Sequence, residues 1–104
     1  TLRGTAEDSI VGAGCIISGG DVDRSVLSPN VMVDKWANIE ESVVFSGCRI
    51  GRNAVVRRTI LDKNVVVADG AEIGVDHELD LARGFHVEGG ITVVPKNATV
   101  PAGH

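Results

Sequence analysis

The pattern that decides the fold runs through residues 42–55, SVVFSGCRIGRNAV. Short segments of the form small–variable–aliphatic alternate there with turns that contain glycine, serine or asparagine. The same template starts at Ser9, Ser25, Ser42 and Thr59, with offsets of 16, 17 and 17 residues. A fixed period of this length indicates a solenoid in which each repeat forms one coil.

Each repeat is built from short strand-like triplets whose first and third residues are small or aliphatic. Because successive side chains of a strand point to opposite faces, these residues should point inward and the middle one outward. We therefore predict an all-β, single-stranded parallel β-helix of about four coils, spaced by the ~4.8 Å of paired strands. The pattern leaves the handedness open, although ordinary crossover connections would favour a right-handed coil. The inward pairs are Cys15/Ile17, Val31/Val33, Cys48/Ile50, Val65/Val67, Ala37/Ile39, Ala54/Val56 and Ala71/Ile73.

Two of the three outward columns are mostly apolar. Such faces on a solenoid predict a covering domain or a second subunit, although β-branched residues also satisfy strand propensity alone. The residues predicted to form this interface are Ile10, Val26, Val43 and Ile60 in one column and Met32 and Val66 in the other.

Length and composition fit one small domain of 104 residues. We expect a linker over residues 1–8, the β-helix over 9–75 and a capping tail over 76–104, with a helix over 76–83 and two short strands after it. A net charge of −4 argues against a nucleic-acid partner, and no apolar run reaches the ~20 residues of a membrane span. Cys15 and Cys48 share an inward column two coils apart, roughly 9.6 Å, which is too far for a disulfide and fits a cytoplasmic protein.

Most of the basic residues have charge partners in their own columns. Arg57 and Arg58 should stack on the acids one coil earlier, as rungs of charge ladders. Arg52 stacks between a lysine and an aspartate, so it is partly matched. Lys63 has no acid in its column and is free to meet a phosphate. The three histidines lie outside the repeats and form no catalytic or metal-ligating set, so we predict neither a catalytic nor a metal site in this chain.

The runs over residues 42–51, 56–65 and 70–74 resemble the carboxy-terminal domain of bacterial glucose-1-phosphate adenylyltransferase, of the actinobacterial type. The tail is similar as well, in residues 83–85 and 89–94. The resemblance implies a left-handed β-helix in a cytoplasmic homotetramer. It also implies a separate amino-terminal catalytic domain that uses ATP and Mg²⁺ to make ADP-glucose for glycogen synthesis. The chain itself would be a non-catalytic regulatory and oligomerisation domain with no cofactor of its own.

In that family, basic residues of this domain bind a phosphorylated effector. The resemblance assigns this role to Lys63 and Lys96, and we add Arg83 and Arg52 to the predicted effector set. Gly84 departs from relatives that carry a second arginine there. Three alternatives stay open: a hexapeptide-repeat acyltransferase that binds acyl-CoA, a related guanylyl- or uridylyltransferase tail, and a pure assembly module.

Overall fold

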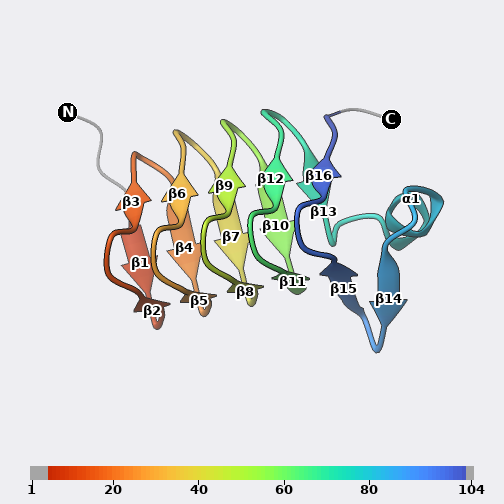
Figure 1. Ribbon diagram of the computed structural model, residues 1–104, viewed down its shortest axis with the longest axis horizontal. Coiled ribbons are helices and arrows are strands. Elements are labelled where there is room, and N and C mark those ends of the chain that lie inside the picture. The colour runs from red at the N-terminus through yellow and green to blue at the C-terminus, as the bar shows by residue number, and fades with distance from the viewer. Residues whose placement is uncertain (1–4, 103–104) are drawn as a thin grey trace.

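The computed structural model describes residues 5–102 as an elongated parallel β-helix of 37 × 22 × 22 Å (Figure 1). Three sheets of paired parallel strands form its sides, and each coil contributes one short strand to each sheet in turn. Four complete coils follow one another from Thr5, which confirms the predicted all-β solenoid. No helix within residues 5–102 has the length and apolar character needed to cross a bilayer.

The three faces are called sheets A, B and C here. Sheet A contains β1 (Thr5–Glu7), β4 (Asp21–Asp23), β7 (Asn38–Glu40), β10 (Val55–Arg57) and β13 (Glu72–Ile73). Sheet B contains β2 (Ile10–Val11), β5 (Val26–Leu27), β8 (Val43–Val44), β11 (Thr59–Leu61), β15 (Ile91–Val94) and β14 (His86–Glu88). Sheet C contains β3 (Ile16–Ile17), β6 (Met32–Val33), β9 (Arg49–Ile50), β12 (Val66–Val67) and β16 (Thr99–Val100).

The core consists of the inward columns that the triplets predict. Val44 pairs in register with Leu61, and Val33 with Ile50, so like residues stack on like residues. All four of these side chains are fully buried. Cys48 is buried in the same way and is a free thiol. Small aliphatic side chains therefore fill the narrow core.

The corner between sheets A and B is closed by a recurring hydrogen bond. A single residue with positive φ, such as Glu41 at 49°, makes the turn. The Ser or Thr that follows donates its hydroxyl to the carbonyl two residues earlier. In the first three members of the series, Ser9, Ser25 and Ser42, the same oxygen also accepts the main-chain N–H of the next Ser or Thr in the column. These hydroxyl bonds are Ser9 to Glu7, Ser25 to Asp23, Ser42 to Glu40 and Thr59 to Arg57, at 2.7–2.8 Å.

The ends of the solenoid differ from the predicted segment boundaries. Residues 5–7, expected in a linker, form β1, because Ala6 stacks on Val22 in the inward column of sheet A. Residues 1–4 of that segment lie outside the described residues. At the other end, β15 pairs with β11 and β16 with β12, so much of the tail is a fifth coil rather than only a cap.

The fifth coil is interrupted at the corner between sheets A and B. After β13 the chain leaves the solenoid, forms α1 (His77–Ala82) and β14, and returns as β15 (Figure 1). Asp76 caps α1, because its carboxylate accepts the N–H groups of Glu78 and Leu79 at 3.0 and 3.3 Å. The predicted helix and both predicted strands are present.

Candidate anion-binding site

Lys63 and Lys96 occupy the same corner in neighbouring coils. Lys63 lies in the turn between β11 and β12, and Lys96 lies in the matching turn between β15 and β16. The N–H of Asn97 donates to the carbonyl of Lys63 at 2.9 Å, which fixes one turn directly over the other. Each lysine precedes an asparagine with positive φ, 59° at Asn64 and 63° at Asn97, so both turns have the same shape. The fold thus brings together two lysines that are far apart in the sequence.

The charge environment of this pair favours an anion. Both lysines are exposed. Neither ammonium group has an ion-pair partner among residues 5–102. The neighbouring Asp62 turns one carboxylate oxygen to the main-chain N–H of Lys63, at 2.7 Å. Like charges stacked one coil apart repel each other, and a bound phosphate would relieve that repulsion with charge-assisted hydrogen bonds.

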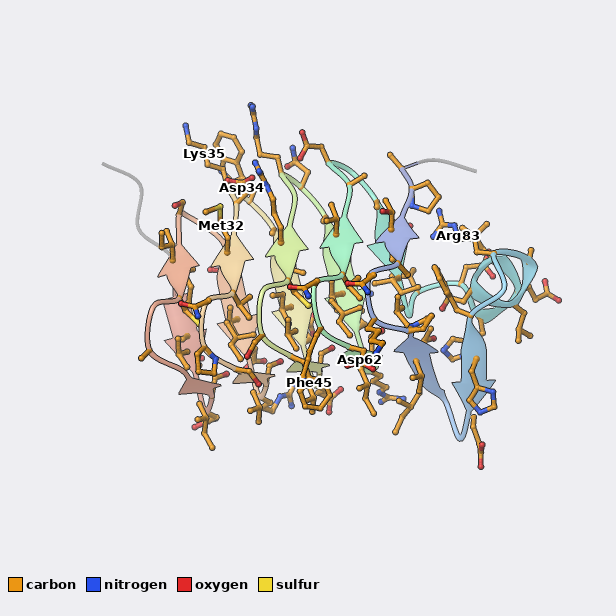
Figure 2. The ribbon with its side chains drawn as sticks, in the orientation of Figure 1. Met32, Asp34, Lys35, Phe45, Asp62 and Arg83 are labelled. Carbon is orange, nitrogen blue, oxygen red and sulfur yellow. The ribbon has the colours of Figure 1, made fainter. Side chains whose placement is uncertain are left out.

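The other two predicted effector residues lie elsewhere. Arg52 lies at the corner between sheets C and A, where its main-chain N–H donates to the carboxylate of Asp69 at 2.8 Å. Arg83 follows α1, and its guanidinium donates to the carbonyls of Glu72 and Pro101 at 2.9 and 3.0 Å. In Figure 2, Arg83 lies beside α1, well away from Asp62 at the lysine corner. The predicted set of four is therefore split, and only its two lysines share a corner.

The arginines of the charge ladders are engaged as predicted. Arg57 pairs with Glu40 at 3.4 Å, and Arg58 pairs with Glu41 at 3.4 Å. All four residues line a hollow of about 300 Å³ together with Gly74 and His77. These pairs are solvent-exposed, so each contributes little to stability, but the pairing leaves less positive charge for a ligand.

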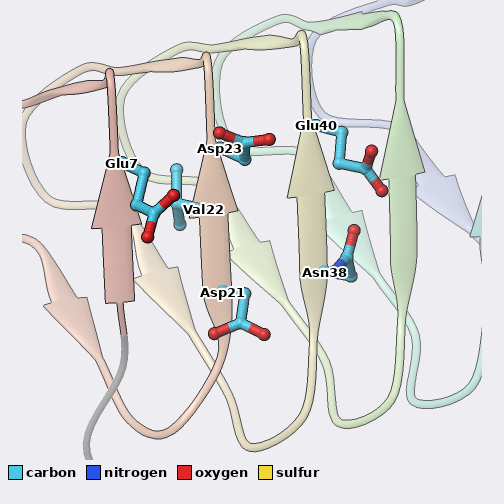
Figure 3. Close-up of a pocket in the computed structure, with 6 residues that line it drawn as sticks. All are labelled: Glu7, Asp21, Val22, Asp23, Asn38 and Glu40. Carbon is cyan, nitrogen blue, oxygen red and sulfur yellow. The ribbon is translucent and has the colours of Figure 1, made fainter.

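A second hollow lies on the outer face of sheet A and has the opposite character. It has a volume of about 360 Å³ and is lined by Val22, Asn38 and four acidic side chains, as Figure 3 shows. Its charge is wrong for a phosphorylated ligand. Within residues 5–102, no three His, Cys, Asp or Glu side chains are placed to hold a metal ion together. The acidic side chains of this hollow are Glu7, Asp21, Asp23 and Glu40.

The outer face of sheet B carries the continuous apolar column that the sequence predicts. Val26 pairs with Val43 and Val43 with Ile60, and Val93 of the fifth coil extends the column beyond the predicted residues. Ile10, at the first coil, is 68% exposed. The column on sheet C is interrupted, because Arg49 stands between Met32 and Val66 and pairs with Asp34. Sheet B therefore offers the more continuous apolar surface.

These features define a hexapeptide-repeat β-helix domain with a basic corner and an apolar outer face. The sequence matches the family described as GlmU-like, C-terminal hexapeptide, over residues 1–94, and the chain belongs to that family. The match fits the left-handed winding that the resemblance predicts.

Curated relatives are highly similar to this chain. It is 55% identical over 101 residues to the glucose-1-phosphate adenylyltransferase of Cutibacterium acnes, which covers 96% of the chain and 25% of that protein. The proteins of the same name from Parafrankia sp. and Bifidobacterium longum are 59% and 57% identical over 98 residues, 93% of the chain and 24% of each protein. The predicted resemblance is confirmed, and the chain spans about a quarter of the length of these relatives.

Proposed function

We propose that this chain is the regulatory and assembly domain of a glucose-1-phosphate adenylyltransferase, and that Lys63 and Lys96 bind its phosphorylated effector. The observation that carries the effector site is the stacking of these lysines on one corner, tied by the bond from Asn97 to Lys63 at 2.9 Å. The named relatives support the activity of the whole enzyme, which would make ADP-glucose and pyrophosphate from ATP and glucose 1-phosphate for glycogen synthesis.

In this proposal, catalysis belongs to another domain of the same protein. We assign ATP and Mg²⁺ to that domain, as the family resemblance implies. The apolar column on sheet B would pack on it or on another subunit of a homotetramer, since a continuous apolar surface is stabilised by being covered. The free thiols of Cys15 and Cys48 suit an enzyme that works in the reducing cytoplasm.

The test is an effector titration of the gene product that carries this sequence. ADP-glucose formation is measured with phosphorylated metabolites over a range of concentrations. Lys63→Ala and Lys96→Ala should each raise the effector concentration for half-maximal response about tenfold or more, the loss of one charge-assisted bond. Arg57→Ala is the matched control, because it removes a cation that is already paired with Glu40.

Three outcomes would contradict the proposal at different points. An unchanged response in both lysine variants would remove the effector site. A gene product that prefers GTP or UTP to ATP would favour a related nucleotidyltransferase. Saturable micromolar binding of acetyl-CoA, with no ADP-glucose formation, would favour the acyltransferase alternative.

A further inference from the structure

The buried carboxylate of Asp80 replaces the hydrogen-bond acceptor of the corner that the fifth coil lacks. In the earlier coils, the Ser or Thr after the corner donates its hydroxyl to a carbonyl two residues before it. Thr92 occupies that position in β15, but the excursion through α1 has removed the corner in front of it. Its hydroxyl donates instead to Oδ2 of Asp80, at 2.8 Å. Asp80 thereby supplies the acceptor that the backbone supplies elsewhere.

The same oxygen also holds the other side of the opened corner. The N–H of Gly74 donates to Oδ2 of Asp80 at 3.0 Å. Gly74 follows β13 and stands in the column of Glu40 and Arg57, where the chain leaves the solenoid. One carboxylate oxygen therefore joins the residue at which the chain departs to the residue at which it returns.

Burial makes this contact costly to lose. Asp80 and Thr92 are both fully buried, so water cannot reach either side chain to replace a lost hydrogen bond. The second oxygen of Asp80, Oδ1, is buried without a hydrogen-bond partner among the described residues. An aliphatic side chain would leave no buried oxygen unpaired, but it could accept neither of the two hydrogen bonds. The carboxylate at this position is explained if Oδ2 must accept both bonds at once.

Thr92, which donates its hydroxyl to Asp80, lies on β15, the strand that leads to Lys96. Thr92 pairs in register with Thr59, and β15 then runs through Val94 to the turn that holds Lys96. The position of Lys96 relative to Lys63 therefore depends on how β15 pairs with β11, which is called the seating of β15 below. In the complete coils this seating is enforced by a covalently continuous corner. In the fifth coil, the hydrogen bonds that Gly74 and Thr92 donate to Asp80 replace that corner.

We propose that Asp80 is a positioning residue for the anion site, which it serves by fixing β15 on β11 through Thr92. This proposal rests on the proposed function, because it assumes that Lys63 and Lys96 bind a phosphate group. Asp80 does not touch the anion. It keeps the two ammonium groups at the spacing of one coil, so that a single phosphate meets both.

The experiment uses the full 104-residue chain, labelled with ¹⁵N, and inorganic phosphate as the probe. Thr92→Val removes the hydroxyl at nearly constant volume and is milder than a change at Asp80. Thr92→Ser should restore the bond, and Ser25→Ala removes the equivalent hydroxyl at a corner three coils away. NMR measures two quantities: the phosphate concentration that half-saturates the shifts of Lys63 and Lys96, and the hydrogen exchange of selected amides.

Two amides report the seating of β15 by internal comparison. The Asn97 amide donates to the carbonyl of Lys63 and so joins the turn after β15 to the turn after β11. The Asn64 amide donates to the carbonyl of Ser46, at 3.0 Å, and makes the same contact one coil earlier. In Thr92→Val, exchange at Asn97 should accelerate about tenfold relative to Asn64, and phosphate should bind severalfold more weakly. Thr92→Ser should return both values to those of the wild type, and Ser25→Ala should change neither ratio.

The outcomes separate the two proposals. Unchanged exchange at Asn97 and unchanged phosphate binding in Thr92→Val would overturn the positioning role while leaving the anion site in place. Faster exchange at Asn97 with unaltered phosphate binding would also overturn it, because the seating of β15 would then not govern the site. Absence of phosphate shifts at Lys63 and Lys96 in the wild type would refute the anion site itself, whatever the exchange rates.

Discussion

Replacing Ser42 with alanine should be one of the most damaging single-atom deletions in this fold. The Ser42 hydroxyl is buried and makes two bonds: it donates to the carbonyl of Glu40 at 2.7 Å and accepts the N–H of Thr59 at 3.2 Å. Losing the first bond costs about 1 kcal/mol, and leaving the buried N–H of Thr59 without an acceptor costs about 1–3 kcal/mol more. The expected loss in free energy of unfolding is therefore about 2–4 kcal/mol. For a domain of this size, that lowers Tm by roughly 10–20 °C.

Ser9→Ala is the matched control for this prediction. Ser9 makes the same two bonds, to the carbonyl of Glu7 and from the N–H of Ser25, but it lies on the first coil and is only partly buried. Water can replace its hydroxyl, so its loss should cost less than about 1 kcal/mol. Urea and thermal unfolding, followed by circular dichroism, measure both values. If the two variants lose the same free energy, burial of the Ser/Thr column is not what makes these bonds strong.

The remaining predictions concern a strained turn, a buried thiol and the apolar face. Trp36 has a φ of 59° and is 60% exposed, so Trp36→Asn should raise stability by about 1 kcal/mol, visible as a higher urea midpoint; a lower midpoint would mean that the indole packs more than it strains. Burial raises the pKa of the Cys48 thiol above its ordinary value of 9.0, so folding favours the protonated form and stability should fall as pH rises beyond about 9. Cys48→Val should show a smaller loss of urea midpoint between about pH 8 and about pH 10 than the wild type. The isolated chain should self-associate through sheet B in ultracentrifugation, and Val43→Lys should reduce this association; a wild type that stays monomeric at all concentrations would count against a covered face.

The repeat made most of the fold predictable. A period of 16 or 17 residues determines which side chains stack, and stacking separates inward from outward positions. The ladder from Asp23 through Glu40 to Arg57 follows from that alignment alone, and the structure pairs these residues in that register. Local periodicity suffices here because each coil of a solenoid contacts mainly its neighbours.

The fifth coil was missed because the excursion through α1 interrupts the period. Its signal is nevertheless present: residues 92–97, TVVPKN, repeat the pattern of residues 59–64, TILDKN. Aligning these two stretches would have predicted that Lys96 stacks on Lys63 without any resemblance to a known family. The first strand was missed for a different reason, since residues 5–7 offer only Ala6 as an inward side chain.

The buried role of Asp80 had no comparable signal. In the sequence it is one of several acids in a short helical segment, where an acid is ordinarily exposed to solvent. Only the three-dimensional path of the chain places it between Gly74 and Thr92. The two carbonyl partners of Arg83, those of Glu72 and Pro101, had no sequence signal either, because they lie 11 and 18 residues away along the chain.

The residues that we propose to bind the anion, and to position it, lie where this domain departs from the repeat. Stacked columns of matched residues, such as Glu40 and Arg57, satisfy each other and leave little for a ligand. Lys63 and Lys96 stand out because their column contains two cations and no acid. This unbalanced column includes the fifth coil, in which the side chain of Asp80 bridges the interrupted corner between sheets A and B. A change in the seating of α1 would therefore reach Lys96 through Asp80 and Thr92, whereas the corners of the complete coils would resist it. The proposed anion site would thus lie at the point of the solenoid where the position of a charge is most easily adjusted.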